Sequence, residues 1–92
     1  MRSTSRFALN KRSPKLTVYG RAYCHLCDEM ISGLRKLQAT EHFELEVVDV
    51  DRDPVLEARF GERVPVLVGA GSELCHYRLD FAKLNEYLSK IG

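Results

Sequence analysis

The sequence has 92 residues, 45% of them hydrophobic, which suits a single domain with its own apolar core. Its 14 basic and 13 acidic residues leave a formal net charge of +1. That balance provides no strong field for nucleic acid or an anionic membrane. No segment approaches the roughly 18 apolar residues of a membrane span. We therefore expect a soluble protein with no nucleic-acid partner and no membrane partner.

A basic leader, residues 1–14, carries cationic side chains and no acidic one: Arg2, Arg6, Lys11 and Arg12. Its apolar run, residues 7–9, is too short for a secretory signal, and Pro14 interrupts the helix that a mitochondrial presequence would form. We expect a disordered arm over 1–14 and a folded domain over 15–92. Three cysteines without a secretory signal argue against a structural disulfide framework. A reducing, cytoplasmic location is therefore expected.

The first predicted strand covers residues 15–19, a short run of β-branched and aromatic residues that Gly20 closes. From Cys27 onward, apolar residues recur at spacings of three and four, which places them on one face of a helix: Met30, Ile31, Leu34 and Leu37. A strand that leads directly into an amphipathic helix is expected here.

Residues 44–50 form a nearly continuous apolar run, which is typical of a strand buried on both faces. Asp53 and Pro54 then resemble the N-cap and first-turn proline of a short helix that Gly61 ends. Helix capping and solvation are also the expected roles of the whole acidic run, rather than a calcium or magnesium site: Asp49, Asp51 and Asp53.

The last part of the chain predicts a hairpin and a helix. Strands are expected at 64–68 and 73–77, with a turn between them. Pro65 should open its strand, because proline cannot donate a ladder hydrogen bond, and its ring can then face a functional groove. The final helix, capped by Asp80, has apolar residues at helical spacing: Phe81, Leu84, Leu88 and Ile91. The predicted order is β-α-β-α-β-β-α.

Cys24 and Cys27 stand where the first predicted strand meets the first helix. Backbone amides and the helix macrodipole stabilise a negative charge there, so Cys24 is the expected thiolate, with a pKa below the usual value of about 8.5. Cys27, one turn further and on the buried face, can attack a mixed disulfide on Cys24. The pair predicts a thiol-disulfide oxidoreductase that needs no metal or organic cofactor.

Through these residues the sequence resembles the glutaredoxin-like branch of the thioredoxin superfamily over residues 15–92. The shared features are a strand ending at Tyr19 and Gly20, an aromatic residue before the cysteine pair, and Val64-Pro65. The resemblance implies an α/β thioredoxin-like fold, with a mixed four-stranded sheet flanked by helices. We expect a monomer that acts on protein or low-molecular-weight disulfides. It also implies a cis Val64-Pro65 bond, beside which the backbone pairs with an extended substrate.

The same resemblance bears on the electron donor, which we expect to be glutathione or a thioredoxin reductase. In the family a glycine-containing stretch before the last helix holds glutathione, whereas this chain has His76 and Tyr77 there. The charged residues that could still bind glutathione are Asp80, for its amino group, and Arg21, for a carboxylate. We therefore expect glutathione, if it binds, to bind weakly.

Two residues near the cysteines have open interpretations. Tyr23 is expected either to line the substrate groove over the Cys24 thiolate or to be a surface loop residue. His25 either stabilises that thiolate as a nearby imidazolium or is an exposed spacer.

Two other functions use the same residues. Zinc accepts a Cys3His set, which this chain could supply from Cys24, Cys27, Cys75 and His76, and an iron-sulfur scaffold would use the same thiolates. Adjacent residues of a strand project to opposite faces, however, which disfavours a joint role for Cys75 and His76. Cys75 is expected to be a partly buried small residue. A redox-inert adaptor that holds extended peptides beside Pro65 is the third hypothesis.

Overall fold

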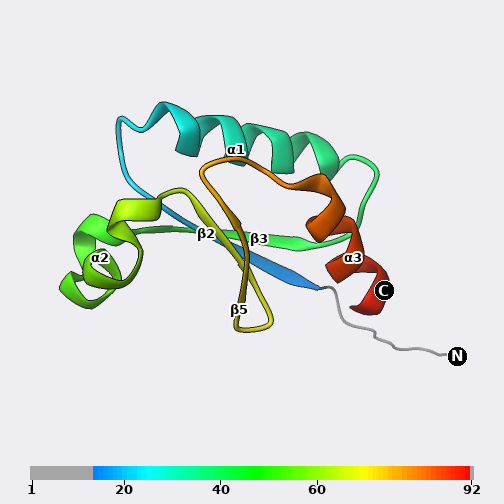
Figure 1. The fold of residues 1–92 in the computed structure, drawn as a ribbon. Helices are drawn as coiled ribbons and strands as arrows, with labels where there is room; N and C mark the ends of the chain where they lie inside the picture. Colours follow the sequence, from blue (N-terminus) through cyan, green and yellow to red (C-terminus); the bar gives the residue numbers. More distant parts are fainter. Residues whose placement is uncertain (1–13, 92) are drawn as a thin grey trace, which may run out of the picture.

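The structure is a computed structural model that describes residues 14–91, so the arm predicted over 1–14 lies outside the described residues except for Pro14. The chain forms strands and helices in the predicted order: β2 (Lys15–Gly20), α1 (His25–Leu37), β3 (Glu44–Asp49), α2 (Pro54–Phe60), β4 (Val66–Gly69), β5 (Ser72–His76) and α3 (Phe81–Ile91) (Figure 1). Single-turn 3-10 helices flank α2: η2 (Val50–Arg52) and η3 (Gly61–Arg63). Within this part of the chain, no helix is long and apolar enough to span a membrane.

The strands form one mixed sheet in the order β3-β2-β4-β5. β2 is parallel to β3 and antiparallel to β4, and β4 is antiparallel to β5. α1 runs along one face of the sheet, and α2 lies at the end of the sheet where β3 finishes (Figure 1). The predicted mixed four-stranded sheet flanked by helices is confirmed.

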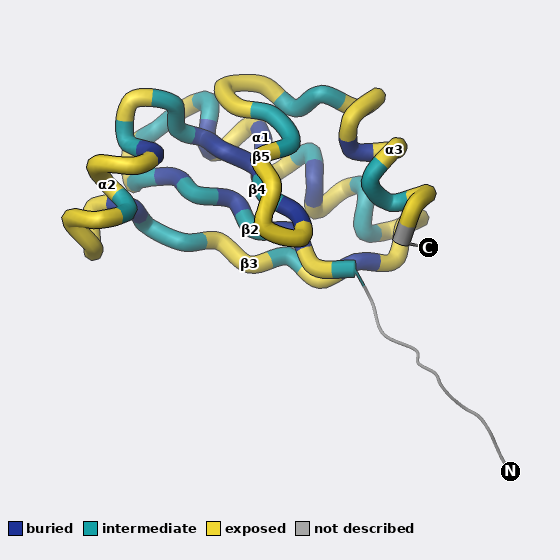
Figure 2. The backbone as a smooth tube through the Cα atoms, turned by 60° about the horizontal axis from the view of Figure 1, so that its bottom comes forward, coloured by how far each residue is buried: buried dark blue, intermediate teal, exposed yellow. Residues whose placement is uncertain are grey.

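The core has two parts, one on each face of the sheet. The larger part joins α1 and α3 to β2 and β4 through buried side chains: Leu16, Val18, Met30, Leu34, Phe43, Leu67 and Leu84. The smaller part lies under α2 and consists of Val50, Phe60 and Val66, with the Tyr19 ring stacked on Phe60 at 4.3 Å between centroids. Buried backbone accordingly follows β2 and β4 through the middle of the molecule (Figure 2).

The expectation that residues 44–50 form a strand buried on both faces is wrong. β3 is an edge strand, and none of its six side chains is fully buried. On the face opposite α1, the reason is the position of α2, which packs through Phe60 onto Val50, Val66 and Tyr19 rather than along β3. One face of β3 is therefore left without a helix, and the strand is drawn mostly as exposed and intermediate in Figure 2.

The predicted caps are confirmed in detail. Asp53 Oδ1 accepts a hydrogen bond from the Val55 amide at 2.9 Å, and Pro54 occupies the first turn of α2. Asp49 Oδ1 likewise accepts from the Asp51 amide at 2.9 Å at the start of η2. Gly61 ends α2 but keeps a right-handed conformation, so the chain continues directly into η3.

The hairpin turn is shorter than predicted. Ala70 and Gly71 both have positive φ values, 51° and 80°, as in the two-residue loops that match the twist of antiparallel strands. β5 therefore begins at Ser72, and it forms the second edge of the sheet.

Candidate active site

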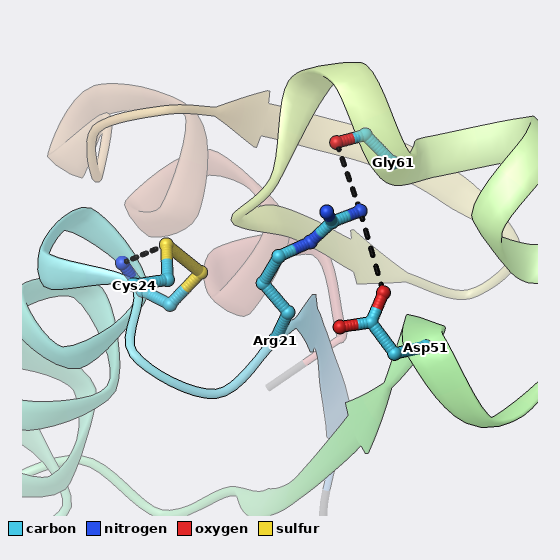
Figure 3. The surroundings of a disulfide bond; sticks show 5 residues. Arg21, Cys24, Asp51 and Gly61 are labelled. Carbon is cyan, nitrogen blue, oxygen red and sulfur yellow. Dashed lines mark hydrogen bonds and ion pairs between the residues drawn. A yellow bond between two sulfur atoms is a disulfide. The ribbon is translucent and has the colours of Figure 1, made fainter.

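Cys24 is the N-cap residue of α1, and its sulfur faces the free amides of the helix. The Cys27 amide donates a hydrogen bond to Cys24 Sγ at 3.1 Å. The two cysteines are joined by a disulfide, with their Cα atoms 5.2 Å apart (Figure 3). A donor and a helix N-terminus aimed at the same sulfur stabilise its negative charge once the disulfide is reduced. The placement predicted for the nucleophile is therefore present.

Cys27 is 1% exposed and packs against the sheet beside Met30. Gly20 makes this packing possible, since a Cβ atom added there would lie 3.1 Å from Cys27 Sγ. Cys24 is only partly buried. The two sulfurs thus differ in access, as a nucleophile and a shielded resolving thiol must.

The Val64-Pro65 peptide bond is cis, as the resemblance implied. Pro65 is buried immediately before β4, and its carbonyl accepts a hydrogen bond from the Tyr77 amide at 2.9 Å. Val64 has an extended backbone, with φ −61° and ψ 143°. This is the backbone shape that an added strand-like segment requires.

Arg21 points away from the disulfide, toward Asp51 and Gly61 (Figure 3). Its Nη2 pairs with the Glu57 carboxylate, lies 3.6 Å from Asp51 Oδ1 and donates to the Gly61 carbonyl at 3.4 Å. Arg21 Nε is buried and has no hydrogen-bond partner among the described residues. The residue expected to meet a substrate carboxylate is therefore already paired with carboxylates of its own chain.

Tyr23 and His25 flank Cys24, and both are exposed. Tyr23 has φ 58° and a fully exposed side chain, so in this form it does not pack over the sulfur. The 85% exposed side chain of His25 pairs through Nε2 with Glu29 Oε2 at 2.8 Å. The negative charge of Glu29 opposes any stabilisation of a thiolate by a His25 imidazolium. Contact of either residue with substrate stays a prediction.

The segment before α3 is organised by its own side chains. Asp80 Oδ1 accepts from the Lys83 amide at 3.1 Å and so caps α3, as predicted. The Tyr77 hydroxyl donates to the Glu62 carbonyl at 3.1 Å, and His76 Nδ1 lies 2.7 Å from Glu73 Oε2. Across residues 14–91, no three His, Cys, Asp or Glu side chains come together as a metal site. The Cys3His set is therefore not assembled.

Cys75, half-buried in β5, should react slowly with alkylating agents. Burial raises the pKa of its thiol, so less thiolate is present at neutral pH, and labelling should accelerate only as the pH approaches that raised pKa. In reduced protein treated with iodoacetamide, peptide mass spectrometry should find Cys24 modified first. The denatured protein, where both thiols are solvated, serves as the control. Equal labelling rates in the folded protein would contradict this expectation.

Two features of the site were missed by sequence reasoning. Gly20 was assigned only as the end of a strand, although a glycine within a strand can signal close approach of another group, here Cys27. The pairing of Arg21 with Glu57 had no local signal, because 36 residues separate them in the chain.

The chain matches the family model described as glutaredoxin-like domain (DUF836) over residues 15–89. It is similar to the solution structure of protein Ne2328 from Nitrosomonas europaea, with 46% identity, a TM-score of 0.78, and coverage of 87% of this chain and 96% of that one. The X-ray structure of target protein XcR50 from X. campestris is 37% identical, with a TM-score of 0.65 and coverage of 82% and 96%.

The thioredoxin protein Deadhead from Drosophila melanogaster has the same fold. It is 23% identical to this chain, with a TM-score of 0.51 and coverage of 87% of this chain and 82% of that one. The thioredoxin-like fold implied by the sequence resemblance is thereby confirmed.

Proposed function

We propose that this chain, which belongs to the glutaredoxin-like domain family, is a thiol-disulfide oxidoreductase that works through Cys24 and Cys27 in the reducing environment of the cytoplasm. The observation that carries the proposal is the asymmetry of the pair at the start of α1. Cys24 is accessible and accepts a hydrogen bond from a helix amide, while Cys27 is buried one turn further. This is the geometry that sequential attack by two thiols requires.

The reaction needs no other redox group. The reduced Cys24 thiolate attacks one sulfur of a substrate disulfide, and the other substrate sulfur leaves with the electron pair as a thiolate. A mixed disulfide between Cys24 and the substrate results. Cys27 then attacks Cys24 Sγ. The substrate sulfur that was bonded to Cys24 leaves as a thiolate, and the Cys24–Cys27 disulfide forms. Two electrons pass from the cysteine pair to the substrate, and a donor must return them before the next cycle.

The extended backbone at Val64 beside cis-Pro65 supports a peptide substrate, which could pair with it as a short added strand. We therefore propose another protein's disulfide as the main substrate, with the chain acting as a monomer. A reductase assay on a protein disulfide, with glutathione and a thioredoxin reductase compared as donors, tests this proposal. Reduction with either donor supports an oxidoreductase and identifies its partner. No reduction with both would contradict it.

Glutathione should be a poor substrate because Arg21, the cation near the cysteine pair, already interacts with acidic side chains of this chain. Arg21 is paired with Glu57 and lies near Asp51, so a carboxylate of glutathione would meet net negative charge there. Tyr77 adds a bulky side chain, 47% exposed, before α3. Asp80 would be the acidic partner of the tripeptide's amino group, but its carboxylate already accepts the hydrogen bond that caps α3.

Titration of reduced Cys27→Ser protein with oxidised glutathione should give slow glutathionylation, alongside brisk reaction with a protein disulfide. Glu57→Gln in the same background should accelerate glutathionylation several-fold, because it removes a negative charge beside Arg21. Glu46→Gln, which removes an exposed acid that pairs with Lys15 on β3, is the matched control and should have no effect. Mass spectrometry against time measures all three. Fast, saturable glutathionylation of the Cys27→Ser protein would show that the groove accepts the tripeptide.

A further inference from the structure

A cavity of about 300 Å³ opens beside the buried sulfur of Cys27, between α1 and the edge of the sheet formed by β2 and β3. Its lining includes Gly20, Cys27 and the charged side chains of Arg21, Asp28 and Asp49. A space of this size holds several water molecules, and the charged side chains within its otherwise mostly apolar lining provide them with hydrogen-bond partners. The cavity therefore links a thiol that is 1% exposed to ionisable groups.

The register of the sheet places Asp49 next to Cys27. Gly20 and Asp49 are partners in the parallel pairing of β2 and β3, so they lie on neighbouring strands, roughly 4.8 Å apart, and project to the same face. At Gly20 that direction leads straight to Cys27 Sγ, as the 3.1 Å separation of an added Cβ shows. The half-buried Asp49 side chain therefore leaves the sheet on the α1 side, one strand away from the sulfur.

The second step of the proposed reaction creates a need for a base at this position. Burial disfavours the charged form of a thiol, yet Cys27 must become a thiolate to attack the mixed disulfide. At that stage the Cys24 sulfur is bonded to substrate and has no charge with which to accept a proton. Of the two carboxylates lining the cavity, Asp28 is exposed to solvent, whereas Asp49 is held by its bond from the Asp51 amide.

We propose that Asp49 is the proton acceptor for Cys27 in the resolving step, acting through water in this cavity. The inference rests on the proposed oxidoreductase function. The Cys27 thiol gives its proton through the water to the Asp49 carboxylate, and the thiolate attacks Cys24 Sγ. The bond between Cys24 and the substrate sulfur breaks, the substrate leaves as a thiolate, and the cysteine pair closes to a disulfide. Asp49 then returns its proton to solvent.

Stopped-flow absorbance with dithiodipyridine as the substrate separates the two steps. This neutral disulfide releases one coloured thiopyridone when Cys24 attacks and a second when Cys27 resolves. Cys75→Ser serves as the background, so that every signal comes from the pair. Asp49→Asn should leave the first phase unchanged and slow the second at least about tenfold at pH 7, the scale on which a positioned base contributes. The second phase should recover at high pH, where the thiol ionises without help.

The choice of variants separates a chemical role from a structural one. Asparagine keeps a side-chain oxygen for the Asp51 amide, and Asp49→Glu keeps the carboxylate and should retain a fast second phase. Glu46→Gln, on the same strand but facing away from α1, is the control for charge. Besides Cys27, the ionisable side chains that line the cavity are Arg21, Asp28 and Asp49, and Asp51 lies next to Arg21. Because Asp28 is the other carboxylate in the lining, the pH profile is also recorded for Asp28→Asn.

A normal second phase in Asp49→Asn would overturn the inference, as would a slow phase in Asp28→Asn alone or equal slowing by Asp49→Asn and Asp49→Glu. The failure of the proposed function looks different, because the parent protein would then reduce no protein disulfide with either donor, although its partly exposed Cys24 thiol would still react with dithiodipyridine.

Discussion

Replacing Cys24 by serine is expected to abolish disulfide reduction, whereas Cys27→Ser should accumulate a covalent mixed disulfide with the substrate. The serine hydroxyl at position 24 cannot attack a disulfide, so the first step is lost. In Cys27→Ser the first step proceeds at the helix N-terminus, but no thiol remains beside Cys24 to release the substrate. Intact-mass spectrometry after addition of a protein disulfide measures the adduct directly.

Cys75→Ser is the matched control, because it makes the same chemical change in β5, away from the pair. It should retain reductase activity close to that of the unmodified protein. An adduct on Cys24→Ser, with none on Cys27→Ser, would reverse the roles assigned to the two cysteines.

Leu34→Ala should produce a large loss of stability. Leu34 is fully buried on α1 in the cluster that joins α1 and α3 to the sheet. Truncating a buried leucine removes apolar contacts and leaves a cavity, which costs about 2–5 kcal/mol of unfolding free energy. A small domain has only about 5–15 kcal/mol in total. Urea denaturation of the oxidised protein should show a lower midpoint with little change in slope.

Val55→Ala is the corresponding control, because Val55 lies on α2 and is 71% exposed. Its effect should stay within about 0.5 kcal/mol. A loss below about 1 kcal/mol for Leu34→Ala would mean that α1 contributes less to the cooperative core than its burial indicates.

Much of the fold could be predicted because its signals are local. The change from a β-branched run to apolar residues at helical spacing marks the passage from β2 to α1, and Cys24 falls at that boundary. Asp53 with Pro54 marks the start of α2 in the same way, since a cap and the residues it serves are neighbours in the chain. The hairpin was recognised, but its turn is shorter than predicted, because the residues that adopt positive φ are Ala70 and Gly71.

The burial of β3 could not be predicted, because an apolar run has the same sequence in the centre of a sheet and at its edge. The difference arises from where α2 packs, and Phe60 takes that helix to Val50 and Val66 rather than along the strand. Hydrophobicity sets how much surface a segment can bury, while the packing of distant elements sets how much it does bury.

The sequence by itself determined the position of the cysteine pair. Cys24 at the start of a helix and Cys27 on its buried face follow from spacing and helix periodicity, and the structure places both there. Only the tertiary structure decided what surrounds the pair. Arg21 meets Glu57 across 36 residues, and Asp49 reaches the side of Cys27 through the pairing of β2 with β3. Both depend on strand register and helix packing, which bring together residues with no local relation in the chain.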